Sequence, residues 1–244
     1  MSIPKVIHYC WFGKGKLPAL AEKCIKSWEK FCPDYKIVCH NEDNFDISQN
    51  RYAKEAYDAG KWAFASDYAR LKVLYDEGGI YFDTDVELIK PIDELIEDGG
   101  YMGFDDNGVI STGLGFACEK GNELVGALLE DYDGISFKLP DGTFDLTPCP
   151  DRNTKVMESL GMDISNQNQV FMGIHMLPED YLCPMKYYTG KKKITKNTYS
   201  IHHFCASWTS STAKRTLFVK RLVGVRMYAK LYGKFLHKFK WLEW

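Results

Sequence analysis

Two aspartates separated by one residue, Asp83 and Asp85, follow a short run of β-branched and aromatic residues, Ile80–Phe82. Alternate residues of an extended chain point to the same side, so these two side chains share a face, with Cα atoms about 6.6 Å apart. No basic residue lies between or directly beside them. Such a pair suits a hard divalent cation better than an ion pair. The spacing therefore indicates a metal site at the end of a buried strand.

Three polar residues on a predicted helix precede this pair: Ser66, Asp67 and Arg70. They are three and four residues apart, so they share one helical face. On an ordinary surface helix this ion pair would contribute less than about 1 kcal/mol.

Two adjacent histidines, His202 and His203, are further candidate ligands. They lie in the segment 199–206, which we predict to be the last strand. Neighbours on a strand face opposite sides, so only one of them can point into a site. A lone histidine is ordinarily a hydrogen-bonded core residue, and the sequence leaves the choice between the two open.

The elements that carry these residues form a recognisable order. Apolar residues recur at helical spacing from Phe64 to Tyr75, and Gly78-Gly79 terminates this helix before the strand that ends at Asp83. Earlier in the chain, two predicted strands, 3–12 and 35–39, flank a helix at 20–31. Strand, helix and strand with short connections predict a parallel α/β sheet.

Ligands of such sheets bind where the carboxyl ends of the strands meet. Trp11, Asn41 and Asp83 would lie at this edge. The remaining predicted strands are 101–106, 109–117 and 170–177, and the remaining helices are 122–132 and 151–160. We interpret 133–150 as an irregular segment that could border an acceptor.

Composition excludes several classes of protein. A net charge of −2 over 244 residues does not suggest a nucleic-acid-binding protein, and the eight cysteines lack the paired spacing of a zinc site. The first residues lack a signal-peptide pattern and no apolar run approaches the roughly 20 residues of a membrane span. We therefore expect a cytoplasmic protein with free thiols.

The segment 209–244 differs from the rest of the chain. It carries nine Lys or Arg residues and one acid, and its apolar residues fall on one helical face: Phe218, Leu222, Val225, Ala229, Tyr232, Leu236 and Phe239. Two interpretations remain open. This helix packs on the domain, or it lies as a basic amphipathic helix on an anionic membrane at the cytoplasmic face. We interpret the basic turn 190–193 as solvated.

The aspartate pair alone has several interpretations. It could cap a turn, or it could be the nucleophile motif Asp-x-Asp-x-Thr/Val of a haloacid-dehalogenase-like phosphatase. Against the phosphatase, Glu87 stands where Thr or Val is needed and the motif lies deep in the chain. An EF-hand is disfavoured because Leu88 replaces the required glycine.

Three ordered blocks decide between these interpretations. The chain resembles the DXD-containing glycosyltransferase family 32 in three segments, which are FASDYARLKVLYDEGGIYFDTDV, VIHYCWFGKGKLP and SIHHFCASW. This family includes yeast initiating mannosyltransferases and bacterial capsule and exopolysaccharide transferases, and the glucosylating domain of large clostridial toxins is a distant relative. The blocks span about residues 3–208, so the resemblance does not cover the basic tail.

The resemblance implies a role for each matching residue. Asp83 and Asp85, with His202 or His203, would hold Mn²⁺ or Mg²⁺, and Asp67 and Arg70 would join the two aspartates as catalytic residues. The implied donor-binding residues are Trp11, Asn41, Ser66, Asp67, Arg70, Tyr81, Asp83, Ser207 and Trp208. Asp105 and Asp106 could flank the acceptor. An Asn that is frequent in the family near Ser111-Thr112 is absent here.

We therefore expect a GT-A-like α/β domain, with a Rossmann-type nucleotide-sugar-binding sheet, over 1–208 and a basic amphipathic helical tail over 209–244. The resemblance implies a retaining transferase that moves a hexose from a UDP- or GDP-sugar to a growing glycan, free or lipid-linked, in polysaccharide biosynthesis. The alternatives are the phosphatase described above and an inactive nucleotide-sugar-binding module.

Overall fold

The chain folds around a seven-stranded sheet in the computed structural model, which describes residues 2–205, 211–224, 227, 228 and 230. The strands lie in the order β2-β1-β3-β6-β5-β8-β7. Their bounds are β1 Val6–Cys10, β2 Lys36–His40, β3 Gly79–Tyr81, β5 Gly100–Gly103, β6 Phe116–Cys118, β7 Gln169–Phe171 and β8 Ile174–Leu177. A two-stranded sheet pairs β4 Val86–Leu88 with β9 Ser200–His202. The predicted α/β class is confirmed.

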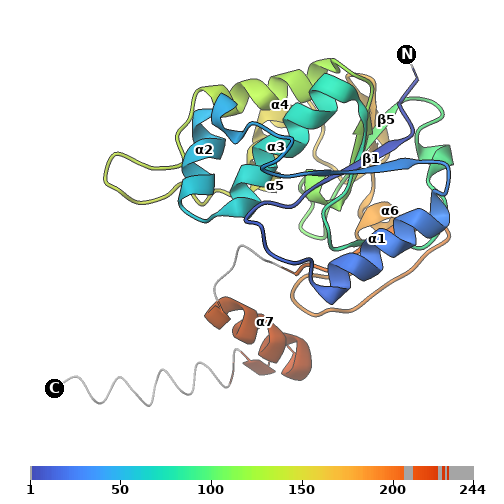
Figure 1. Cartoon of the computed structure of the whole chain (residues 1–244). Helices are drawn as coiled ribbons and strands as arrows, with labels where there is room; N and C mark the ends of the chain where they lie inside the picture. The colour runs from blue at the N-terminus through green and yellow to red at the C-terminus, as the bar shows by residue number, and fades with distance from the viewer. Residues whose placement is uncertain (1, 206–210, 225–226, 229, 231–244) are drawn as a thin grey trace.

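Helices cover both faces of the large sheet (Figure 1). The helices α2, α3, α4 and α5 lie on one face, and α1 and α6 lie on the other. Their bounds are α1 Ala19–Phe31, α2 Arg51–Asp58, α3 Trp62–Glu77, α4 Glu123–Asp133, α5 Cys149–Ser159 and α6 Glu179–Leu182. Each face has its own core, and adjacent residues of β6 divide between them: Phe116 packs in the first and Ala117 in the second.

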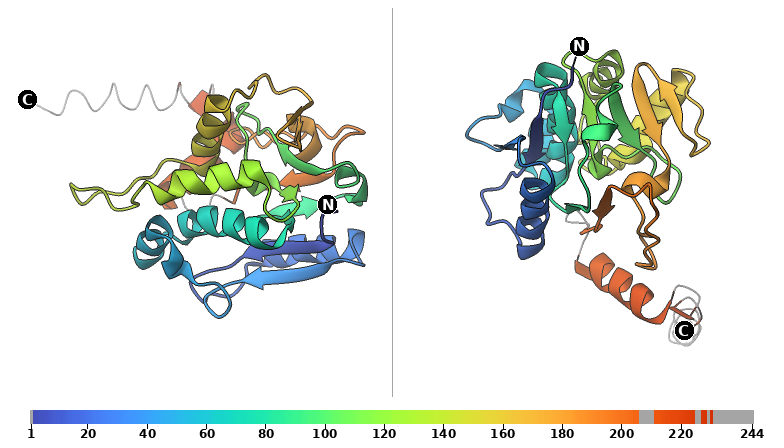
Figure 2. Two further views of the ribbon diagram at one scale, coloured as in Figure 1. Left: turned by 90° about the horizontal axis from the view of Figure 1, so that it is seen from above. Right: turned by 90° about the vertical axis from the view of Figure 1, so that its right-hand side faces the viewer.

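The sheet is parallel on one side and mixed on the other. β1 is parallel to both β2 and β3, and β5 is parallel to β8, whereas β6 and β7 run antiparallel to their neighbours. Figure 2 (right) shows this sheet running from the blue N-terminal strands to the orange β8. The chain passes from β1 to β2 on one side and then returns to β3 on the other. The carboxyl ends of β1 and β3 therefore form a topological switch point, where ligands of such sheets bind.

The predicted helix, Gly-Gly stop and strand are confirmed as α3, Gly78-Gly79 and β3. Gly78 ends the helix with φ +71°, in the left-handed region that favours glycine. A Cβ on Gly79 would lie 2.8 Å from the Val6 carbonyl oxygen, so glycine also lets β3 pack directly on β1.

Two predicted strands are wrong in detail. Within 109–117 the chain forms a short 3₁₀ helix, η3 Thr112–Leu114, and becomes a strand only at Phe116. Gly115, with φ +115°, separates the two elements. The predicted strand 170–177 is a hairpin of β7 and β8, because Met172 and Gly173 both take positive φ and reverse the chain.

A helix outside the sheet layers, α7 Ser211–Val223, follows the domain (Figure 1). Among the described residues, no helix is both long and apolar enough to cross a membrane.

A buried histidine pair ties β1 to β2 and to the end of α3. His8 Nδ1 lies 2.9 Å from His40 Nε2, and His8 Nε2 lies 3.1 Å from the Gly78 carbonyl oxygen. The carbonyl can only accept, so His8 Nε2 carries the proton and His8 Nδ1 accepts from His40. Burial lowers the pKa of His8 to about 4, aided by His40, and burial also lowers the pKa of His40. Both rings are therefore neutral in the folded chain.

We predict that this pair makes the fold sensitive to acid. The unfolded chain takes up a proton on His8 near pH 6.5, whereas the folded chain does so only near pH 4, so this stability is present above pH 6.5 and lost as the pH falls towards 4. The expected loss is about 3 kcal/mol for a pKa difference of this size. Urea unfolding at pH 7 and pH 4.5 measures it. His8→Gln should flatten the pH dependence, and His175→Gln, on a half-buried histidine of β8, is the control.

Candidate functional site

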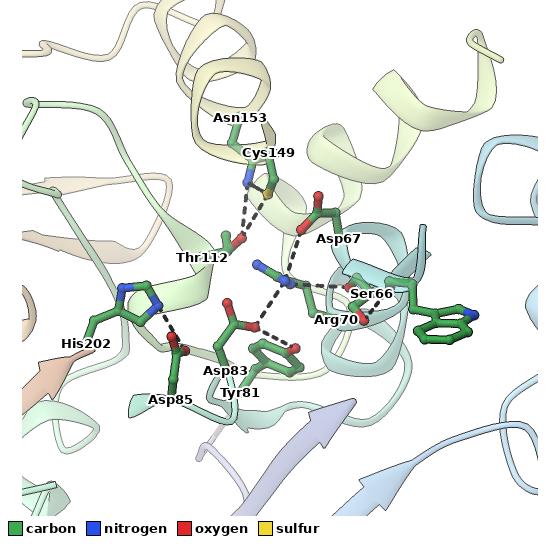
Figure 3. Close-up of polar contacts among 11 residues, drawn as sticks. Ser66, Asp67, Arg70, Tyr81, Asp83, Asp85, Thr112, Cys149, Asn153 and His202 are labelled. Carbon is green, nitrogen blue, oxygen red and sulfur yellow. Dashed lines mark hydrogen bonds and ion pairs between the residues drawn. The ribbon is translucent and has the colours of Figure 1, made fainter. Parts of the chain in front are cut away.

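Three side chains from two distant segments meet beside the switch point. Asp83 and Asp85 follow β3, and His202 ends β9; one ligand atom from each lies within 4.8 Å of the others (Figure 3). The antiparallel pairing of β9 with β4 brings His202 close to the two aspartates, because His202 lies directly opposite Val86, the residue after Asp85. The structure thus brings the two sequence-predicted aspartates together with one of the two candidate histidines.

Asp85 is held in place from several sides. Its Oδ1 lies 3.1 Å from His202 Nε2, and its Oδ2 accepts a 2.7 Å hydrogen bond from the Cys205 N–H. Burial acts to raise the pKa of Asp85, but His202 and the Cys205 N–H outweigh it and hold that pKa well below its usual range. Burial acts to lower the pKa of His202, but Asp85 and then Asp83 outweigh it, so the pKa of His202 is raised. Each of these two groups thus favours the charged form of the other.

His203 points away from this cluster. Its Nε2 lies 2.8 Å from Glu87 Oε2, and Glu87 also pairs with Lys23 at 2.8 Å. Of the two histidines that the sequence left open, His202 is the one placed beside Asp83 and Asp85.

The cluster fits a divalent cation. Two carboxylates and one imidazole form a ligand set suited to Mn²⁺ and, through the carboxylates, to Mg²⁺. Nδ1 of His202 is buried and has no hydrogen-bond partner in the part of the chain that the structure describes. The other ring nitrogen, Nε2, faces the aspartates and is the one that would bind an ion held by them.

Arg70 lies at the centre of the neighbouring network. The residue is 5% exposed, and its Nη2 lies 3.0 Å from Asp67 Oδ1 and 3.1 Å from Asp83 Oδ1. Its Nε donates to the Ser66 carbonyl oxygen at 3.3 Å, and its guanidinium lies 5.1 Å from the centre of the Tyr81 ring. Tyr81 in turn donates its hydroxyl to Asp83 Oδ1 at 2.9 Å. The guanidinium of Arg70 thus links Asp67 on α3 with Asp83 at the end of β3.

The two carboxylates around Arg70 differ from ordinary surface carboxylates. Burial raises the pKa of Asp67 to about 7, although Arg70 acts to lower it. Burial also raises the pKa of Asp83, again against Arg70. Carboxylates whose pKa values are shifted by burial and by a specific charged partner are typical of functional sites.

A further polar cluster, which the sequence analysis missed, backs this network. Thr112 Oγ1 lies 3.3 Å from both Cys149 Sγ and Asn153 Nδ2, and the three residues are almost fully buried (Figure 3). Cys149 lies beside Asp67. At the next residue, a Cβ on Gly113 would come within 3.3 Å of Arg70 Nη1 and collide with Asp83 Oδ2. The burial of Thr112 and Asn153 is a signal that only the structure reveals.

The residues expected at the nucleoside end lie near the ends of β1 and β2. Trp11 is half-buried, and its Nε1 donates to the Gly15 carbonyl oxygen at 2.6 Å. Asn41 accepts from the Asp43 N–H at 2.9 Å, so its side chain also shapes its own turn. Ser66 donates its hydroxyl to the Trp62 carbonyl oxygen at 2.9 Å. Ser207 and Trp208 lie outside the described residues.

The two aspartates considered for the acceptor side have structural partners. Asp105 Oδ1 accepts from the Asn107 N–H at 2.7 Å, and Asp106 Oδ2 accepts from the Tyr187 N–H at 3.0 Å. Asp105 therefore stabilises its own turn, and Asp106 holds the loop that contains Tyr187.

Comparisons with known proteins indicate the family that this chain resembles. Residues 18–100 match the family model of the glycosyltransferase sugar-binding region containing the DXD motif. An inositol phosphoceramide mannosyltransferase 3 of Schizosaccharomyces pombe is 26% identical over 145 residues, which cover 56% of this chain and 39% of that protein. The chain thus aligns with well under half of the length of this curated relative.

Solved structures of glycosyltransferases align with this chain at low sequence identity. The PaToxG glycosyltransferase is 20% identical, with a TM-score of 0.49 over 65% of this chain and 70% of that one. A glycosyltransferase involved in the glycosylation of the major capsid of PBCV-1 is 15% identical, with a TM-score of 0.46 over 87% of this chain and 97% of that one. The family match confirms the resemblance seen in the sequence and supports a glycosyltransferase as the enzyme class.

Proposed function

We propose that this chain, whose residues 18–100 match the model of the DXD-containing glycosyltransferase sugar-binding region, is a metal-dependent transferase that moves a hexose from a nucleotide-sugar to a glycan acceptor. One observation carries the proposal. The cluster of Asp83, Asp85 and His202 shares its first aspartate with the buried Arg70–Asp67 pair. A site for a cation and a site for a polar anionic ligand are thus continuous.

The chain's own residues would divide the work. Asp83, Asp85 and His202 would hold Mn²⁺ or Mg²⁺, which supplies Lewis-acid neutralisation of the charge on a departing nucleoside diphosphate. Arg70 is fixed by two carboxylates, so its remaining N–H groups can donate to a phosphate or a sugar hydroxyl without reorganisation. Asp67 Oδ2 can accept from a sugar hydroxyl. We extend the proposal to retention of anomeric configuration, as the family resemblance implies.

The phosphatase alternative gains no support from the geometry. Glu87, which stands where the phosphatase motif needs Thr or Val, pairs with Lys23 and His203. Asp83 Oδ1 contacts Arg70 and the Tyr81 hydroxyl, which are groups that also suit the donor site of a transferase. The inactive nucleotide-sugar-binding module differs from the transferase only in turnover.

Donor hydrolysis tests the proposal. The chain is incubated with UDP-glucose, UDP-galactose or GDP-mannose and Mn²⁺, and released sugar is measured, with EDTA as the metal-free control. We expect metal-dependent release from one of these donors, because water can replace the acceptor. Donor binding without release, in the presence of a glycan acceptor mixture, would favour the inactive module. Hydrolysis of a simple phosphomonoester without nucleotide-sugar binding would contradict the proposal.

We also propose that the tail 209–244 binds an anionic membrane surface, which would place a lipid-linked acceptor next to the site at the cytoplasmic face of a membrane. The described part of the tail supports this. On α7, Phe218 and Leu222 lie one turn apart and are 67% and 74% exposed. The helix contacts the domain through a basic residue instead: Arg221 donates to the Tyr187 carbonyl oxygen at 3.0 Å and 2.9 Å.

The basic turn 190–193 extends the same surface. Lys191, Lys192 and Lys193 are exposed, and Gly190 lies beside the Arg221 side chain. Exposed apolar residues flanked by lysines match the composition of an interfacial helix. Part of the predicted apolar face, Val225, Ala229, Tyr232, Leu236 and Phe239, lies outside the described residues.

We predict that Phe218→Ser/Leu222→Ser weakens binding to vesicles that contain anionic lipid, while donor hydrolysis in solution is unchanged. Full insertion of two large apolar side chains contributes about 3 to 6 kcal/mol of transfer free energy. We therefore expect the double substitution to lower the affinity for vesicles at least about tenfold. Vesicle co-sedimentation at several salt concentrations measures it. Val170→Ser/Leu160→Ser, on exposed apolar residues of the domain, is the matched control. Equal binding by all three proteins would contradict the prediction.

A further inference from the structure

An exposed tryptophan that the sequence analysis did not assign lies at the ligand-binding edge of the large sheet. Trp62 is the first residue of α3 and is 45% exposed. Because α3 leads directly through Gly78 into β3, its N-terminus lies towards the carboxyl ends of the parallel strands. An indole offers a large, rigid, flat apolar surface to a ligand.

The indole of Trp62 rests on a loop that the protein holds rigidly. A Cβ built on Gly13 would lie 2.6 Å from Trp62 Cδ2 and Cε2, so the ring lies directly on the Gly13 backbone. The Gly13 N–H donates to Glu42 Oε1 at 2.6 Å, and the Tyr57 hydroxyl donates to the same oxygen at 2.9 Å. Gly13 has φ +91°, so glycine is required both for the loop conformation and for this contact.

Trp62 is also aligned with the centre of the site. Trp62, Ser66 and Arg70 follow one another at intervals of four residues, so they share one face of α3. The Ser66 hydroxyl donates to the Trp62 carbonyl oxygen, and Arg70 Nε donates to the Ser66 carbonyl oxygen. Eight residues of helix place Trp62 about 12 Å from Arg70 along the axis. A nucleoside diphosphate with its phosphates at Arg70 and Asp83 has its base at a comparable distance.

We propose that Trp62 provides a stacking surface for the nucleobase of the donor. One face of its indole lies on Gly13, and the exposed remainder offers the flat apolar area that a base requires. The proposal rests on the proposed function and adds a residue to the donor site. Because every base has a π-face, Trp62 contributes affinity for nucleoside diphosphates in general and not a choice between uracil and guanine.

Paired binding measurements with the full chain test this inference. Binding of UDP, of GDP and of inorganic pyrophosphate, each with Mn²⁺, is measured by calorimetry for the wild type, Trp62→Ala and Trp62→Phe. We expect Trp62→Ala to weaken UDP and GDP binding by roughly tenfold to a hundredfold, while pyrophosphate binding is unchanged. Trp62→Phe should recover most of this loss. UDP should also quench the tryptophan fluorescence of the wild type more than that of Trp62→Phe.

The other outcomes are separable. If Trp62→Ala weakens pyrophosphate as much as UDP, the residue acts only by supporting α3, and the inference is overturned. Unchanged UDP binding overturns it as well. Tyr188→Ala, which removes another half-exposed aromatic ring, should change neither ligand. A wild type that binds neither UDP nor pyrophosphate would contradict the proposed function itself.

Discussion

Replacing Asp85 by Asn is expected to reduce metal-dependent donor hydrolysis at least about a hundredfold, which corresponds to about 2.7 kcal/mol of transition-state stabilisation. The asparagine keeps the size of the side chain and can still accept from the Cys205 N–H, so the loss comes from the missing charge. Without that charge, His202 also loses the partner that raises its pKa. Initial rates across a range of Mn²⁺ concentrations measure both the rate and the metal requirement.

Asp76→Asn is the matched control for this prediction. Asp76 also pairs with a cation, Lys72 at 2.7 Å, but on the exposed side of α3. Its replacement should leave the rate unchanged, and thermal unfolding of both variants should show that the fold persists. If Asp85→Asn has the rate and the metal requirement of the wild type, Asp85 does not bind the ion and the prediction is wrong.

The elements that local patterns determine were predictable. The apolar period of α3 and the stop at Gly78-Gly79 are contained within one segment, and the structure confirms both. The strand expected at 109–117 was wrong because its apolar residues do not reveal that the chain forms η3 at Thr112–Leu114, or that Gly115, with φ +115°, separates η3 from β6. The antiparallel direction of β6 follows from its long-range pairing with β3, which no local period encodes.

The site residues likewise differ in whether a local sequence pattern predicts their positions. Ser66, Asp67 and Arg70 share a face because helical spacing requires it, and the structure places them so. The choice between His202 and His203 depends on the register of β9 against β4, since a shift of one residue would exchange them. The cluster of Thr112, Cys149 and Asn153 joins segments about 40 residues apart and has no motif that sequence could reveal.

Replacing Arg70 by Met is expected to destabilise the chain by about 3 to 5 kcal/mol and to abolish measurable donor hydrolysis. The methionine fills much of the same volume, but it leaves Asp67 and Asp83 buried without their shared cation. Arg70→Lys should lose activity almost as completely, because one ammonium cannot reach both carboxylates and the Ser66 carbonyl oxygen with the same geometry. Urea unfolding and the donor hydrolysis assay measure the two effects.

The pH dependence of Arg70→Met identifies the cause of its instability. Burial already raises the pKa of Asp67 to about 7, and Arg70 acts against that rise. In the variant both carboxylates should stay protonated to higher pH than in the wild type. A carboxyl whose pKa is higher in the folded chain than in the unfolded chain makes the folded chain less stable as the pH rises towards the folded pKa. The variant should therefore be destabilised more at pH 8 than at pH 5. Adding Asp67→Asn to Arg70→Met removes one buried charge and should recover part of the stability at pH 8, but none of the activity. A deficit that is independent of pH would show that Arg70 stabilises the fold by packing alone.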